Sequence, residues 1–239
     1  MEQIKVIAER NDWLVVDKPS GLPTVPLKSD GPEKDTLLSR LGEAYPEVLS
    51  VGRNPWEGGV LHRLDTPTSG LVLVARTQRA FDDLWEEQRH DEIVKTYLAV
   101  SSKRLSPLPV GFVPFPFGDI TLGRTVIRSL FRPFGEKGRV VRPVAEDSPS
   151  ALRGKSTGIW YETEVEFLGK DGTTCRFSCV ITQGFRHQIR CHMAWAGYPL
   201  DGDVTYRGLP EKPFGLTAQE LQFIDPETGK RVRCVRPEA

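Results

Sequence analysis

VLHRLDTPTSGLVLVA, residues 60–75, places a polar, charged loop directly before five apolar residues. The apolar run LVLVA is typical of a buried strand, and Thr77 after it predicts the N-cap of a helix that carries Phe81 and Leu84 at helical spacing. Asp65 in the loop has two interpretations. It either accepts hydrogen bonds from the amides of a turn, which is the usual role of Asp in such a sequence, or it performs chemistry. The local sequence leaves both open.

Further elements can be predicted outward from this stretch. Alternating or β-branched runs, several of them joined by short turns, predict strands at 4–8 and 13–17, at 93–100, at 158–169 and 173–183, and at 220–224 and 230–235. One helix is expected after a cap at Asp35 and before Pro46, and another over 186–196, closed by Gly197. Strands outnumber helices and no βα unit repeats. The fold class expected is therefore α+β, a mixed, largely antiparallel sheet with a few packed helices.

The sequence shows no strong boundary, so we expect a single domain over residues 1–239. Gly, Pro and charged residues predict long loops near 18–34, 105–117 and 133–158. Four prolines in the second of these exclude a central strand there.

Composition indicates a soluble globular protein, with 38% hydrophobic residues in a chain of 239. The N-terminus lacks the unbroken apolar stretch of a signal peptide, and no window reaches the ~18–20 apolar residues of a membrane span. The four cysteines form no CxxC pair, so we expect buried reduced thiols and a cytoplasmic protein.

The net charge is zero, from 32 basic and 32 acidic residues, so no overall field drives this protein onto nucleic acid. Residues 118–142 nevertheless carry six basic and two acidic residues, a local net charge of +4. This stretch is either a solvated loop or an arm that contacts phosphates. Its basic residues include Arg124, Arg128 and Arg132.

Four segments combine charge, glycine and apolar anchors: DKPSGLP (17–23), HRLDTPTSGLVLVA (62–75), KTYLAV (95–100) and GFRHQIRCHMAWAGYPLDGDVTYRG (184–208). In the last, Arg190 lies within an apolar helical pattern, and a buried Arg requires a carboxylate. His187 and His192 are five residues apart, which does not place two metal ligands on one helical face, so we expect no metal site. The chain has neither a phosphate-binding glycine loop nor a GxSxG serine elbow.

Together these segments resemble the RluA-type pseudouridine synthases, which carry the same four motifs in the same order, and the match spans roughly residues 12–208. The resemblance implies isomerisation of a uridine in structured RNA, ribosomal or transfer RNA, without cofactor or metal, and the pseudouridine synthase fold. It implies that Asp65 is the catalytic carboxylate, that Tyr97 stacks on the uracil and that Arg190 pairs with Asp65.

The resemblance also implies the residues that contact RNA. Arg63 is expected to fill the gap left by a flipped uridine, and Leu216 to pack beneath the Tyr97 ring. The substrate-binding residues expected are His62, Arg63, His187, Leu216, Arg124, Arg128 and Arg132. The family often has Arg-Thr or Arg-Ser before HQIR, where this chain has Gly184–His187, and Leu-His-Ala where it has Leu216–Ala218.

No S4-like domain precedes the motifs, so target selection is expected from the catalytic domain, with the Arg-rich stretch as the candidate. A monomer is expected. Two other functions stay open: a catalytically silent RNA-binding or RNA-folding protein on the same scaffold, and another glycosidic-bond enzyme such as a hydrolase. The hydrolase would need a second carboxylate. Asp201 and Asp203 are the candidates for it, in a context that looks structural.

Overall fold

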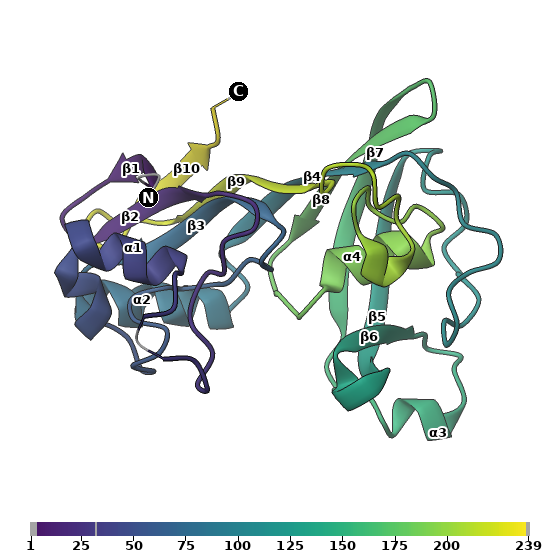
Figure 1. The fold of residues 1–239 in the computed structure, drawn as a ribbon, viewed down its shortest axis with the longest axis horizontal. Coiled ribbons are helices and arrows are strands. Elements are labelled where there is room, and N and C mark those ends of the chain that lie inside the picture. Colours follow the sequence, from purple (N-terminus) through teal and green to yellow (C-terminus); the bar gives the residue numbers. More distant parts are fainter. Residues whose placement is uncertain (1–3, 32, 238–239) are drawn as a thin grey trace. The chain divides into compact units, whose positions relative to one another are not determined.

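The structure is a computed structural model that describes residues 4–31 and 33–237. The chain forms two compact units (Figure 1). Unit 1 comprises Met1–Thr96 with Thr217–Ala239, and unit 2 comprises Tyr97–Leu216. The expectation of one domain stays a prediction, because two compact units of one chain can still fold together.

In the residues that the structure describes, unit 1 contains a sheet, two α-helices and one 3-10 helix. Its strands are β1 (Lys5–Glu9), β2 (Trp13–Lys18), β3 (Ser69–Ala75), β9 (Leu216–Ile224) and β10 (Arg231–Val235). They are ordered β1-β2-β3-β9, with β10 paired to β9. Its helices are α1 (Leu37–Ala44), the 3-10 helix η1 (Pro46–Ser50) and α2 (Gln78–Arg89). The β1–β2 and β9–β10 pairs are the antiparallel hairpins that the sequence predicted.

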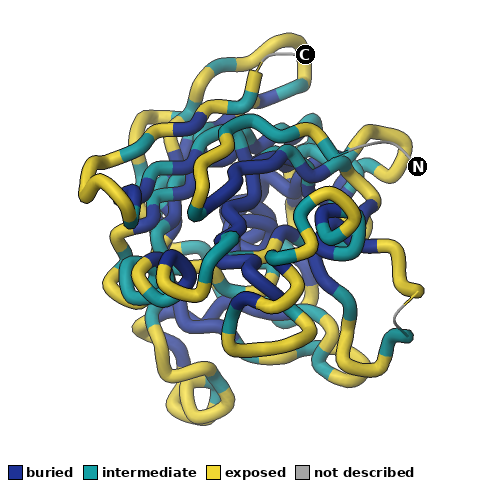
Figure 2. Tube along the Cα trace, turned by 90° about the vertical axis from the view of Figure 1, so that its left-hand side faces the viewer, coloured by how far each residue is buried: buried dark blue, intermediate teal, exposed yellow. Residues whose placement is uncertain are grey.

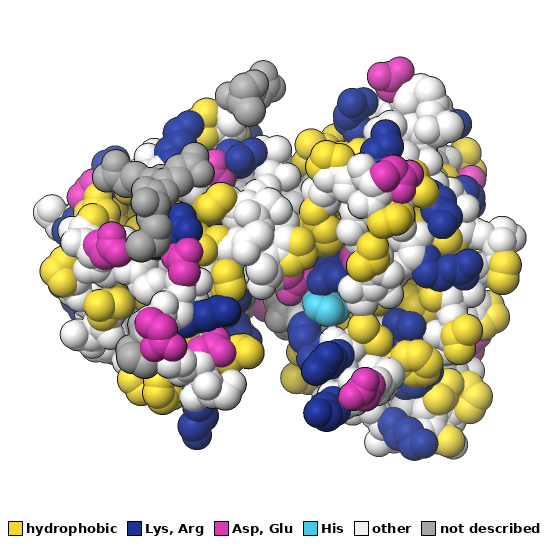
Figure 3. All heavy atoms as spheres, in the orientation of Figure 1, with side chains coloured by type: hydrophobic (Ala, Val, Ile, Leu, Met, Phe, Trp, Pro, Cys, Tyr) yellow, Lys and Arg dark blue, Asp and Glu magenta, His cyan; other side chains and the backbone are white. Residues whose placement is uncertain are grey.

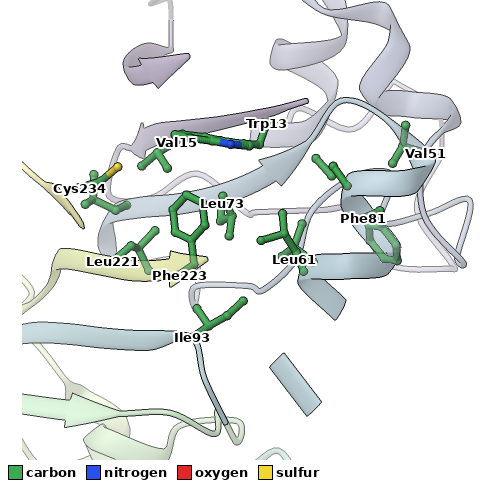
Figure 4. Packing of buried hydrophobic residues seen from close by; sticks show 14 residues of the cluster. Trp13, Val15, Val51, Leu61, Leu73, Phe81, Ile93, Leu221, Phe223 and Cys234 are labelled. Carbon is green, nitrogen blue, oxygen red and sulfur yellow. The ribbon is translucent and has the colours of Figure 1, made fainter. Parts of the chain in front are cut away.

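The core of unit 1 lies between this sheet and α2 (Figure 4). Trp13 meets the Phe223 ring edge-on at 4.9 Å, and Leu73 of β3 packs in the same cluster as Phe81 of α2. The LVLVA run is completely buried, which confirms the predicted strand. In Figure 2, buried residues (dark blue) lie inside the trace and exposed residues (yellow) lie mainly at its periphery.

Glycine is required where β3 meets β9. These two strands run parallel, with Gly70 opposite Ala218. Gly70 has a φ of +113°, and a side chain there would collide with the carbonyl oxygen of Ala218. The glycine of the TSG sequence therefore lets β3 start immediately after the polar loop.

The predicted N-cap residue is confirmed for one helix and wrong for the other. Thr77 accepts a hydrogen bond from the Ala80 amide and caps α2 as predicted. The cap of α1 is Thr36 and not Asp35, because Thr36 and Ser39 exchange hydrogen bonds in a capping box. The Asp35 carboxylate instead pairs with Arg40 at 2.7 Å.

Unit 2 contains β4 (Val94–Ser101), which begins in unit 1, and β5 (Arg124–Phe134), β6 (Val140–Val144), β7 (Tyr161–Asp171) and β8 (Thr174–Ile181). Their order is β4-β8-β7-β5-β6. Its helices are α3 (Ser150–Arg153) and α4 (Gln188–Trp195), with the 3-10 helices η2 (Glu136–Gly138) and η3 (Val204–Tyr206). The β7–β8 hairpin is antiparallel, as are β5–β6 and β5–β7. The α+β fold with a mixed, largely antiparallel sheet is confirmed.

The middle of the chain is more ordered than its sequence pattern indicated. The Arg-rich stretch was left open between a solvated loop and an arm that contacts phosphates, and in the structure β5 and β6 form an antiparallel hairpin there whose apolar residues, such as Ile127 and Phe131, are buried. The predicted loop at 133–158 contains the end of β5, β6 and α3. Pro143 hid β6 from the sequence pattern, yet a strand at the end of the order tolerates proline. No helix or strand lies in 105–117, as predicted.

Helix α4 is buried along its whole length. It begins two residues later than predicted because His187 has a left-handed backbone with a φ of +58°, and Gly197 follows its end with a φ of +86°. All four cysteines are buried free thiols, as the sequence predicted.

Candidate functional site

The loop that carries Asp65 leads directly into β3. Before it, Val60 bridges Val74, and the Leu61 amide donates to the Leu73 carbonyl at 3.1 Å. Within it, the Thr68 amide donates to the main-chain carbonyl of Asp65 at 2.9 Å and closes the turn. Any residue could provide that carbonyl, so this turn bond does not explain a carboxylate at position 65.

The DKPSGLP segment and the residue after it hold this loop on both sides of Asp65. The carbonyl after Asp65, that of Thr66, accepts hydrogen bonds from the Gly21 amide at 2.9 Å and from Lys18 Nζ at 3.2 Å. Before Asp65, Thr24 Oγ1 donates to the Leu64 carbonyl at 2.8 Å and accepts from the Leu64 amide at 3.1 Å. Asp65 therefore lies between two main-chain groups that are fixed by the same neighbouring segment.

Lys18 is the main anchor of this arrangement, although no role was predicted for it. Its side chain is fully buried, and Nζ also donates to the carbonyls of Pro19 and Leu22 at 2.9 and 2.7 Å. Burial lowers the pKa of Lys18 to about 8, while the carboxylates of Asp65 and Asp17 act in the opposite direction. The sequence pattern that could have indicated this role is a lysine at the end of a strand of buried apolar residues.

Lys18→Met is expected to loosen the Asp65 loop. Three carbonyls would lose a charged donor, and such hydrogen bonds contribute about 1.5–3 kcal/mol each when broken from one side, so we expect a loss of at least about 2 kcal/mol in unfolding free energy. Urea unfolding measures it. Lys170→Met, at an exposed position of β7, is the matched control and should change stability by less than about 0.5 kcal/mol. Equal stability of the two variants would contradict the anchoring role.

The two residues before Leu64 differ in environment. The Leu73 amide donates to His62 Nε2 at 3.3 Å, and burial, helped by the Lys95 charge, lowers the pKa of His62 to about 3. The neutral ring must then carry its proton on Nδ1, which is buried and has no hydrogen-bond partner among the described residues. Arg63 is exposed and pairs with Glu57 at 2.8 Å. Their proposed RNA contacts stay predictions.

Acid is expected to destabilise the protein through His62 and His192. His192 is fully buried in α4, with its ring nitrogens 2.9 Å from the hydroxyls of Ser129 and Thr163, and burial lowers its pKa to about 3 as well. The folded protein keeps both rings neutral while the unfolded chain binds protons. Stability is therefore full above about pH 6.5 and falls towards about pH 3, by up to about 1.4 kcal/mol per pH unit for each histidine.

Urea unfolding between about pH 7 and about pH 4 measures this slope. His192→Gln and His62→Gln should each reduce it. His90→Gln is the control, because His90 is exposed and should leave the slope unchanged. A slope that neither core variant alters would rule out these histidines as its cause.

The buried arginine of α4 has its carboxylate within unit 2. Arg190 Nε and an Nη donate to the two carboxylate oxygens of Asp203 at 2.7 and 2.8 Å, and both side chains are nearly inaccessible. The guanidinium also lies 5.5 Å from the Tyr206 ring and 5.4 Å from the Phe214 ring. The requirement for a carboxylate is thus confirmed. Pairing of Arg190 with Asp65, which belongs to unit 1, stays a prediction.

Three other residues predicted for the site belong to unit 2. Tyr97 is a buried residue of β4, and Leu216 is the buried first residue of β9. His187 precedes α4, and its Nδ1 lies 3.3 Å from the hydroxyl of Tyr206. Stacking of Tyr97 on uracil and packing of Leu216 against it stay predictions.

The predicted arm of arginines is largely paired within the sheet. Arg124 pairs with Glu164 and Glu166 of β7 at 3.1 and 3.2 Å, and Arg128 pairs with Glu162 at 3.3 Å. Arg132 donates to the Gly111 carbonyl at 2.9 Å. These glutamates offset much of the local positive charge, and Figure 3 shows basic and acidic side chains interspersed on the visible surface. A role for the three arginines in RNA binding stays a prediction.

Residues 4–31 and 33–237 contain neither a membrane-spanning helix nor a cluster of metal ligands. No helix there has the length and apolar character to span a membrane. No cluster of three or more His, Cys, Asp or Glu side chains is arranged to hold a metal ion.

Comparison with known proteins places these residues in a family. The family model for RNA pseudouridylate synthase matches residues 12–195, which include Asp65, Tyr97 and Arg190. Ribosomal large subunit pseudouridine synthase D of Yersinia pestis is 31% identical over 227 residues, 92% of this chain and 58% of that protein. The protein of the same name from Neisseria meningitidis serogroup B is 29% identical over 252 residues, 98% of this chain and 58% of the relative. The chain thus spans less than two thirds of the length of these relatives.

Solved structures show the same fold. Human RNA Pseudouridylate Synthase Domain Containing 1 has a TM-score of 0.68 at 19% identity, over 99% of this chain and 84% of that one. Human RNA Pseudouridylate Synthase Domain Containing 4 has a TM-score of 0.65 at 17% identity, over 98% and 88%. With most of its length matched by the family model, the chain belongs to the RNA pseudouridylate synthase family.

Proposed function

We propose that this protein isomerises a specific uridine in structured RNA, ribosomal or transfer RNA, to pseudouridine. The observation that carries the proposal is the clamped Asp65 loop, which lies within the part of the chain that matches the family. In the reaction the N1–C1′ bond breaks, the uracil turns, and C5 bonds to C1′. The C5 proton leaves and N1 gains one, so substrate and product have the same composition and neither cofactor nor metal is needed.

Asp65, Tyr97 and Arg190 carry the proposed chemistry. Asp65 supplies an ionised carboxylate that attacks the sugar, attacks the base or removes the 2′ proton. Tyr97 stacks on the uracil and helps with the C5 proton; stacking on an aromatic ring contributes ~1–3 kcal/mol for an unstacked base. Arg190 pairs with Asp65 through donors other than the two that hold Asp203, and a fixed guanidinium keeps a carboxylate ionised in a dry site.

The proposed contacts with RNA extend from this site. Arg63 enters the gap left by the flipped uridine; its pair with Glu57 is exposed, so exchanging it for RNA costs little. His62, His187 and Leu216 border the uridine, and Arg124, Arg128 and Arg132 contact phosphates. We further propose a monomer in the cytoplasm, which the four free thiols support.

The experiment is to incubate the protein with total RNA from a strain that lacks it and to map pseudouridine, with the Asp65→Asn protein in parallel. A missing pseudouridine that reappears only with the wild type supports the proposal. Release of free uracil would instead indicate a hydrolase. Binding of RNA without modification would favour the catalytically silent RNA-binding protein.

A further inference from the structure

Unit 2 contains a pocket of about 420 Å³ that shares no residue with the proposed chemistry and one residue, Arg128, with the proposed RNA contacts. The pocket is formed by the end of the proline-rich connection, by β5, by the residues after β6 and by the residue before β7. Its lining residues are Pro116, Phe117, Arg128, Ala145, Glu146, Asp147 and Trp160. This volume is within the range of small-ligand sites.

One wall combines aromatic rings with a positioned guanidinium. The Arg128 guanidinium lies over the Trp160 ring at 4.6 Å, and its Nε contacts Glu162 at 3.3 Å. The Phe117 ring packs on Phe115 and Trp195, and the side chain is half-buried. Aromatic faces and guanidinium planes are the surfaces on which proteins stack unpaired RNA bases.

The rim supplies two acceptors. Glu146 and Asp147 are exposed, and neither carboxylate forms a hydrogen bond or ion pair with any residue that the structure describes. Two carboxylates beside an arginine are an unusual lining for a site that would bind only phosphate, because they repel the anion. The ligand should therefore offer hydrogen-bond donors to the carboxylates and acceptors to the arginine.

We propose that this pocket binds an unpaired guanine base of the RNA substrate. Its lining residues are far from Asp65 in the sequence. Guanine presents the adjacent donors N1–H and N2–H₂ on one edge and the adjacent acceptors O6 and N7 on another. Arginine binds O6 and N7 in the commonest specific contact with guanine. On the other edge N1–H and N2–H₂ are donors, which a carboxylate can accept. Adenine, cytosine and uracil each lack one of these adjacent pairs. The inference rests on the proposed function, since RNA supplies the base, and it gives Arg128 a base to bind in place of a phosphate.

Calorimetric titration of the whole protein with GMP, AMP, CMP and UMP tests the site. Because a bidentate base contact contributes about 1–3 kcal/mol of discrimination, GMP should bind about 5- to 140-fold more tightly than the other three nucleotides. Trp160→Ala should weaken GMP binding by a similar factor, since it removes an aromatic wall. Glu146→Gln with Asp147→Asn should abolish the preference for GMP, and these exposed substitutions should not affect folding.

Trp56→Ala is the matched control, because Trp56 is an exposed tryptophan of unit 1. It should leave GMP binding unchanged. Equal affinity for all four nucleotides, or full displacement of GMP by inorganic phosphate, would overturn the guanine site. The Glu146 and Asp147 variant decides the question even where Trp160→Ala fails to fold.

The test of the guanine site is independent of the test of the proposed function. The Asp65→Asn protein should bind GMP as the wild type does, because the titration involves no isomerisation. If the enzyme were active but showed no preference for GMP, only the proposed guanine site would be contradicted. With an RNA substrate, the double variant should raise KM and leave kcat within about twofold, a split that a general loss of folding does not produce.

Discussion

Asp65→Asn is expected to lower pseudouridine formation by at least about 100-fold, and by about 10⁴-fold if the carboxylate acts alone in proton transfer. The amide has nearly the same shape but neither a negative charge nor a basic oxygen. The turn would survive, because its closing hydrogen bond uses the main-chain carbonyl of residue 65. The loop would also survive, because Lys18 and Thr24 bind the main chain of its neighbours. Activity should therefore be lost from a folded protein, as measured by the initial rate on the target RNA and by urea unfolding.

Asp82→Asn is the control for this variant. Asp82 lies on α2 of the same unit and pairs with Arg53 at 3.2 Å in an exposed ion pair, which contributes little. Its activity should match that of the wild type. An Asp65→Asn protein that keeps activity within about tenfold would show that the carboxylate has no chemical role, and would return Asp65 to the structural interpretation.

Local patterns were enough to predict most of the elements. Both hairpins of unit 1 and the β7–β8 hairpin follow from alternating or β-branched runs joined by short turns. The α2 helix follows from a Thr cap and apolar residues at helical spacing. In each hairpin the paired residues are close in the sequence, as Glu164 and Val180 are, so the local pattern is enough to predict the pairing.

The failures involve partners that are distant in the sequence. The sequence left the arginines of β5 open between a solvated loop and a phosphate-contacting arm, because their glutamates lie some 40 residues later, on β7. Asp203 was considered only as a second carboxylate of a hydrolase, although the buried Arg190 required a carboxylate, because a sequence does not show which acid meets which base. Lys18 received no role because its partners are main-chain carbonyls, which every sequence contains.

Asp203→Ala is expected to destabilise the protein by about 3–5 kcal/mol, because it leaves the Arg190 guanidinium buried without the carboxylate that binds two of its donors. The Tyr206 and Phe214 rings beside that guanidinium cannot replace a bidentate charged partner. Urea unfolding measures the loss. Glu166→Ala is the contrasting control, since it breaks an exposed pair with Arg124 and should cost less than about 1 kcal/mol.

A combined variant separates the cost of removing one partner from the value of the pair. Arg190→Met with Asp203→Leu removes both charges, so it should be more stable than Asp203→Ala by several kcal/mol, as expected when the penalty comes from a buried charge that has lost a bidentate carboxylate. Its pseudouridine formation should still be lost, because Arg190 is proposed to hold Asp65. If Asp203→Ala were as stable as Glu166→Ala, Arg190 would have another full partner and Asp203 would not be its structural counter-ion. If the stable double variant kept full activity, Arg190 would serve the packing of α4 and not the carboxylate of Asp65.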